Sequence, residues 1–204
     1  MQKRHASIPP FAARTANESA GAAPTSRRFL WLALLVAATI GFSFGFACAV
    51  PFAALGAVAA LTLRRPDALL VAGGAWLANQ IIGFAFLSYP WDANTLAWGL
   101  ALGIIAVLTT LAAQSIGRRL ASRGAFIVSI MAFLGAFIVY EGGLFIVAAL
   151  ALGGTEDFAP DIMRRIIIIN AAAFASLLLL CRLGRALGLT RRPALGFLMT
   201  ERHA

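Results

Sequence analysis

Charged residues are scarce in this sequence. Asp, Glu, Lys and Arg make up 12% of the chain, whereas hydrophobic residues make up 61% and the mean hydropathy is +0.86. Soluble domains contain roughly 25% charged residues because their surfaces face water. This shortage excludes a water-soluble globular domain and indicates that most of the chain lies in a membrane.

Residues with strong chemistry are also few. The two cysteines lack a C-x-x-C spacing, and the two histidines, His5 and His203, lie near the ends of the chain. The phosphate-binding pattern G-x-x-x-x-G-K-[ST] does not occur. No metal site, cofactor or catalytic residue is therefore expected. The protein is not expected to be an enzyme, because no nucleophile, base and orienting group can be combined from these residues.

Long apolar segments are abundant instead. A helix of about 20 apolar residues crosses the ~30 Å hydrocarbon core of a bilayer. The apolar run over 29–63 is too long for one crossing and contains Pro51, where we divide it. The sequence predicts an all-α polytopic membrane protein with six transmembrane helices, over residues 29–47, 51–63, 68–87, 95–116, 125–152 and 162–182.

The two ends of the chain differ from this apolar part. Residues 1–28 are polar, rich in Ala, Pro and Ser and without hydrophobic periodicity, and are predicted to be a disordered basic cytoplasmic tail. Residues 29–184 are predicted to form the six-helix transmembrane domain. Residues 185–204 are predicted to be a cytoplasmic C-terminal tail.

Arginine placement predicts how the helices are oriented. Cytoplasmic loops carry an excess of Lys and Arg, and this chain has its positive charges in alternate connections, at residues 27–28, 64–65, 118–123 and 182–192. With six helices, both termini are then cytoplasmic and the protein lies in the cell's inner membrane. The net charge of +9 is a topology signal and not a nucleic-acid footprint, because it is spread over short loops. Arg164 and Arg165 are the exception, at the outer start of the sixth helix, where their side chains can extend outward or pair with Glu156, Asp157 or Asp161.

Several polar and aromatic residues interrupt the apolar helices in their outer half. Glu141 is notable because ionisable groups inside a membrane are costly and usually functional. Amides on two other helices lie at a similar depth, with tryptophans near them. The candidate residues for binding a small-molecule ligand in an outward-facing pocket are Glu141, Tyr140, Asn79, Gln80, Asn170, Trp76, Trp91 and Trp98.

The same residues also have structural interpretations. The amides can bond neighbouring helices to one another, and Trp91 and Trp98 lie where an interfacial aromatic belt would place them. An ionised Glu141 would need a positive or donating partner. A ligand that binds this ionised form is therefore expected to carry a cationic or donor group.

Small residues recur every four positions along the first predicted helix, at Ala33, Ala37, Gly41 and Gly45. Small side chains allow another helix to approach closely in lipid. This pattern favours either the docking of a partner helix or packing against the second predicted helix.

With six short predicted helices and this small-residue pattern, the chain resembles a known family, the membrane S-component of energy-coupling-factor vitamin transporters. The resemblance covers roughly residues 29–190 at the level of architecture, and its motif is Ala33-Leu-Leu-Val-Ala37. It implies a substrate-binding subunit for uptake of a vitamin-sized molecule. It also implies that Ala33, Ala37 and, along the same face, Gly41 dock a membrane coupling subunit, whose ATPases drive transport.

Two other classes of protein fit this composition. One is a small secondary transporter in which Glu141 carries a proton, although no inverted repeat is visible in the sequence. The other is a non-transporting membrane scaffold or assembly factor, whose polar groups only join helices. Co-purifying ATPase subunits or a retained small molecule would favour the transporter subunit over both.

Overall fold

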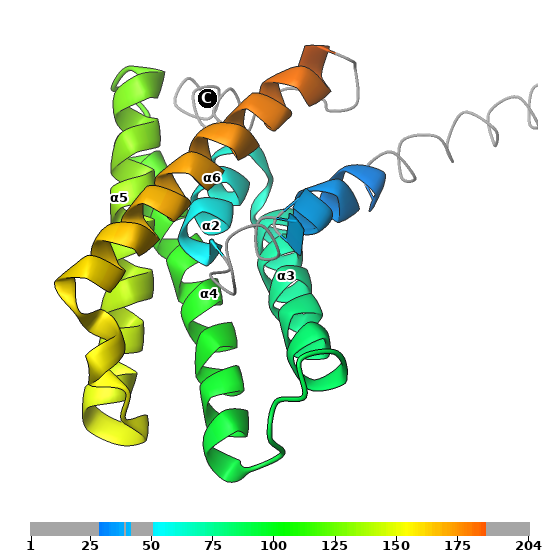
Figure 1. The fold of residues 1–204 in the computed structure, drawn as a ribbon. Helices are drawn as coiled ribbons and strands as arrows, with labels where there is room; N and C mark the ends of the chain where they lie inside the picture. Colours follow the sequence, from blue (N-terminus) through cyan, green and yellow to red (C-terminus); the bar gives the residue numbers. More distant parts are fainter. Residues whose placement is uncertain (1–28, 39, 42–50, 187–204) are drawn as a thin grey trace, which may run out of the picture.

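The structure is a computed structural model that describes residues 29–38, 40–41 and 51–186. All regular secondary structure in these residues is helical (Figure 1). The elements are a helix over Phe29–Ala38, α2 (Phe52–Thr62), α3 (Arg65–Ala85), α4 (Ala93–Arg119), α5 (Ala125–Val147), the π-helical turn η1 (Ala148–Leu152), the 3-10 turn η2 (Thr155–Phe158) and α6 (Pro160–Ala186). The predicted N-terminal tail, most of the C-terminal tail and Gly45 lie outside the described residues.

Four of these helices are long and apolar enough to cross a membrane: Arg65–Ala85, Ala93–Arg119, Ala125–Leu152 and Pro160–Gly184. This agrees with the predicted all-α, multi-pass architecture. The helix Phe29–Ala38 and α2 are shorter. With 11 residues, α2 extends for only about 16 Å, roughly half of a bilayer core. The count of six crossings and the side on which the termini lie stay predictions.

The short helix α2 lies at the centre of the bundle. It contacts α3, α4, α5 and α6 (Figure 1), and every residue from Phe52 to Ala59 is buried. Its residues are apolar all round and mostly small, so it has no face suited to water. A helix of this kind is buried either in protein or in lipid, and here it forms the core on which the longer helices pack.

Side-chain size, more than polarity, separates the inner face of α4 from its outer face. Large residues at Leu96, Leu100, Ile104 and Leu108 recur every four positions and are exposed on the outside of the bundle. The buried positions of the same helix are mostly small, namely Gly99, Ala106, Thr109, Thr110, Ala113 and Gly117. Small residues on the inner face allow the helices to pack closely. On the outer face, large and small apolar side chains are equally soluble in lipid.

The last helix, α6, slants across α2 and α5 (Figure 1). Its buried residues Asn170, Ala173, Leu177 and Cys181 recur every three or four positions, which is the period of one helix face. Phe174 stacks on Phe133 of α5, with ring centroids 4.7 Å apart. This packing brings Asn170 to the start of α2.

Candidate intramembrane polar site

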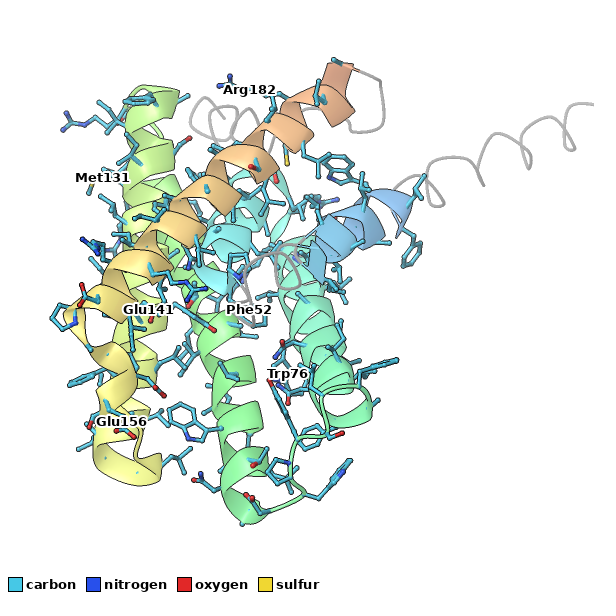
Figure 2. The ribbon with its side chains drawn as sticks, in the orientation of Figure 1. Phe52, Trp76, Met131, Glu141, Glu156 and Arg182 are labelled. Carbon is cyan, nitrogen blue, oxygen red and sulfur yellow. The ribbon has the colours of Figure 1, made fainter. Side chains whose placement is uncertain are left out.

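The carboxylate of Glu141 is buried within the bundle. Glu141 lies on α5 beside Tyr140, and the two residues are only 7% and 6% exposed. The ring of Tyr140 packs against Phe52, the first residue of α2, at a centroid distance of 5.8 Å. Figure 2 shows Glu141 and Phe52 in the middle of the bundle, well away from Arg182 and Glu156 near its two ends. Among the described residues, Glu141 forms no hydrogen bond or ion pair.

Asn170 completes the N-terminus of α2. The first N–H groups of a helix have no partner within the helix, and Pro51, which precedes α2, provides no side-chain cap. The side-chain oxygen of Asn170 accepts a hydrogen bond from the Ala54 N–H at 3.3 Å. Its amide nitrogen donates to the Ile166 carbonyl at 3.1 Å. A residue of α6 therefore acts as the cap that α2 lacks.

A second group of predicted residues joins α3 to α4. The indole N–H of Trp76 donates to the Gly99 carbonyl at 2.7 Å. Glycines of α4 leave room for side chains of α3: a Cβ on Gly99 would come within 2.7 Å of the Gln80 side-chain oxygen, and one on Gly103 within 2.8 Å of the Trp76 ring. Asn79 and Trp98 are half-buried on the same two helices.

The loop after α3 holds Trp91 at the surface. Trp91 is 77% exposed and packs on Phe84, with ring centroids 4.4 Å apart. Asp92 caps α4, because its carboxylate accepts a hydrogen bond from the Thr95 N–H at 2.8 Å. This hydrogen bond lowers the pKa of Asp92 from its ordinary value of 3.8.

The structure divides the eight predicted ligand-binding residues into two separate groups. Glu141, Tyr140 and Asn170 lie between α5, α6 and the start of α2. The other five lie on α3, on α4 and in the loop between them. Figure 2 shows Glu141 and Trp76 on opposite sides of Phe52, with α2 and α4 between α3 and α5 in Figure 1. Whether either group binds a ligand stays a prediction.

Further buried polar residues, on α4, were not among the predicted ligand-binding residues. Thr109 and Thr110 are fully buried, and Gln114 is 7% exposed. The hydroxyl of Thr110 donates to the Ala106 carbonyl at 2.9 Å. Within the described residues, the hydroxyl of Thr109 and the side-chain oxygen of Gln114 have no hydrogen-bond partner. Thr109, Thr110 and Gln114 follow the helical spacing of the buried small residues of α4. This pattern in the sequence could have placed them on the inner face of the helix.

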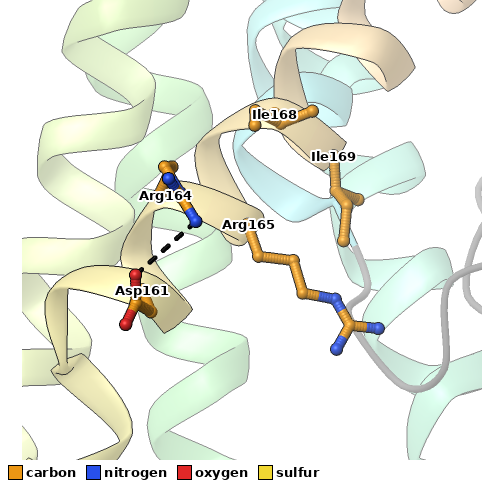
Figure 3. A pocket seen from close by; sticks show the side chains of 5 residues that line it. All are labelled: Asp161, Arg164, Arg165, Ile168 and Ile169. Carbon is orange, nitrogen blue, oxygen red and sulfur yellow. Dashed lines mark ion pairs between the residues drawn. The ribbon is translucent and has the colours of Figure 1, made fainter.

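The pocket found near the predicted outer end of the bundle uses none of the predicted residues. It has a volume of about 580 Å³ and is lined by Asp161, Arg164, Arg165, Ile168 and Ile169 of α6 (Figure 3). Arg164 pairs with Asp161 at 3.6 Å, and both side chains are largely exposed. The described residues contain no group of three or more His, Cys, Asp or Glu side chains that could hold a metal ion.

The small residues of the first helix face outward. Ala33, Ala37 and Gly41 are exposed, whereas Trp31 and Leu35 on the other faces are buried in the bundle. Among the described residues, a Cβ on Gly41 would meet no atom within 4 Å. Within that part of the chain, the predicted docking face is therefore not covered by another helix.

No protein-family model, curated protein or solved structure matches this chain.

Proposed function

We propose that this protein is a membrane-embedded binding subunit for uptake of a vitamin-sized small molecule. The observation that carries the proposal is Glu141, a buried carboxylate without a hydrogen bond or ion pair among the described residues. Such a group is costly inside a membrane and marks a functional position by default. Tyr140, which precedes Glu141 in α5, packs on Phe52 at the start of α2, where Asn170 caps the helix.

The chemistry of Glu141 limits the ligand. An ionised carboxylate in an apolar interior needs a cationic or strongly donating partner. We therefore propose that the ligand carries such a group and that it meets Glu141 from the extracytoplasmic side. In its protonated form Glu141 would act as a neutral hydrogen-bond donor, and the ligand would not need a positive charge.

The proposed arrangement in the membrane has six crossings with both termini in the cytoplasm of an inner-membrane protein. The alternate placement of arginines supports this orientation. The helix α2, with 11 residues, spans by itself only about half of the hydrocarbon core.

We further propose that the exposed face of Ala33, Ala37 and Gly41 docks a membrane coupling subunit linked to ATPases. The outward direction of these small residues supports a partner helix at this face. Bulky substitutions there are expected to prevent docking while ligand binding by the isolated protein survives.

The test begins with mass spectrometry of the purified protein to identify a retained small molecule. Rebinding of that molecule is then measured for Glu141→Gln, with Glu156→Gln in η2, whose side chain is exposed, as the matched control. We expect the first variant to lose more than about tenfold in affinity and the control to bind normally. Unchanged affinity in both Glu141→Gln and Glu141→Ala would remove Glu141 from the site.

A non-transporting scaffold is the second candidate. It is favoured by Asn170 and Trp76, whose polar groups both bond other helices and so join the bundle. A large stable partner that co-purifies without any small molecule would support this function over ligand uptake.

A further inference from the structure

Arg164 and Arg165 place two positive charges where the charge pattern of the chain predicts none. They lie in the second turn of α6, at the end opposite to the arginines that mark the predicted cytoplasmic side. Positive charges at this end are contrary to the usual excess of Lys and Arg in cytoplasmic loops. A specific anionic partner is a physical reason to keep them.

The two arginines differ in what they contact. Arg164 forms the exposed ion pair with Asp161, and such surface pairs contribute little stability. Arg165 is exposed and forms no ion pair with any described residue. In Figure 3 its guanidinium points away from Asp161, toward the same space that the side chain of Ile169 enters.

Polar and apolar parts of the pocket are separated along α6. Arg165 and Ile169 are one helical turn apart, about 6 Å along the axis. Ile168, which is 61% exposed, and the largely buried Ile169 lie on the membrane-interior side of the arginines. The pocket therefore offers positive charge near the end of the helix and an apolar surface one turn deeper. Its volume of about 580 Å³ lies within the usual range for ligand pockets, ~300–1,000 Å³.

We propose that this pocket binds the phosphate group of a molecule with net negative charge, held by Arg165 and Arg164, with an apolar substituent of the same molecule lying along Ile168 and Ile169. Guanidinium groups suit phosphate because their planar N–H donors match its oxygens. Both an anionic phospholipid and a small phosphate ester have this chemistry. The pocket is lined by none of the residues grouped around Glu141, so this inference does not rest on the proposed function.

The experiment uses native mass spectrometry of the full chain in detergent, titrated with phosphatidylglycerol or with phosphatidylcholine. The wild type is expected to bind the anionic lipid about tenfold more tightly than the zwitterionic one, and Arg165→Gln to lose most of this preference. Arg182→Gln is the matched control, because Arg182 is an exposed arginine at the other end of the same helix. It is expected to keep the preference.

A competition with inorganic phosphate distinguishes the two sources. Displacement of the lipid by millimolar phosphate indicates a site for small phosphate compounds, whereas no displacement indicates a lipid headgroup site, and both results support phosphate binding. Equal binding of the two lipids, or equal losses in Arg165→Gln and Arg182→Gln, would overturn the proposal. The exposed position of Arg165 makes folding of the variant the expected result, which thermal unfolding checks.

Discussion

The polar groups between α2, α5 and α6 differ from those between α3 and α4 in burial, because Glu141 and Asn170 are buried whereas Trp76, Asn79 and Gln80 are half-buried. Between α3 and α4, the indole of Trp76 is already bonded to the Gly99 carbonyl. Between α5 and α6, Asn170 is bonded to both α2 and α6, but the neighbouring Glu141 has no hydrogen bond or ion pair among the described residues. Burial of a polar group therefore marks a binding candidate only after its bonds to other helices are considered.

The largest expected effect on stability comes from Asn170. Asn170→Leu keeps a similar volume but leaves the buried N–H of Ala54 without its acceptor. An unsatisfied buried donor costs about 1–3 kcal/mol. We expect a loss of this size in the free energy of unfolding, measured by denaturation in detergent.

Asn79→Leu is the matched control for Asn170→Leu. Asn79 is half-buried on α3 and makes no hydrogen bond with the described residues. Its replacement is expected to change the free energy of unfolding by less than about 0.5 kcal/mol. Equal losses in the two variants would show that Asn170 does not have a special capping role.

A smaller effect is expected at the interface of α3 and α4. Trp76→Phe removes the indole N–H that bonds Gly99 but keeps an aromatic ring in the contact. Hydrogen bonds between membrane helices contribute about 0.6 kcal/mol on average. We expect a loss of that order in denaturation experiments, and no effect on the proposed binding of a ligand at Glu141.

Trp98→Phe provides the comparison for Trp76→Phe, because no hydrogen bond joins the Trp98 indole to the described residues. It is expected to leave the stability nearly unchanged. A loss of ligand binding in Trp76→Phe, with stability retained, would place Trp76 at the ligand. It would contradict the proposal that the ligand binds only in the group around Glu141.

The smallest effect concerns the start of α4 and its dependence on pH. The hydrogen bond from Thr95 lowers the pKa of Asp92 below 3.8, so the folded state favours the ionised carboxylate. The resulting stabilisation is present above the ordinary pKa and is lost as the pH falls through the lowered pKa. We expect a slight fall in the melting temperature of the wild type over this acidic range.

Asp92→Asn separates this effect from general acid damage. Its amide oxygen can still accept the Thr95 hydrogen bond but does not titrate in this range. The difference in melting temperature between wild type and Asp92→Asn is expected to shrink on acidification. A difference that stays constant with pH would show that ionisation of Asp92 does not stabilise α4.

The positions of the long helices were predictable because each needs only a sufficiently long apolar run. The predicted spans 68–87 and 95–116 lie close to α3 and α4, and 125–152 corresponds to α5 with η1. The span over 51–63 was placed correctly as a helix, but its central position was not predicted. Hydropathy does not distinguish a helix surrounded by protein from one surrounded by lipid, since α2 is apolar on all sides.

The sequence alone determined that this is a helical membrane protein, because its shortage of charge and its long apolar runs permit little else. Only the tertiary structure decided which faces turn inward, since small and large apolar residues are equally soluble in lipid and differ only in how closely helices pack around them. It also decided the role of Asn170. That residue caps a helix 116 positions earlier in the chain, and no local pattern could reveal this partner because the contact depends on how α6 crosses α2.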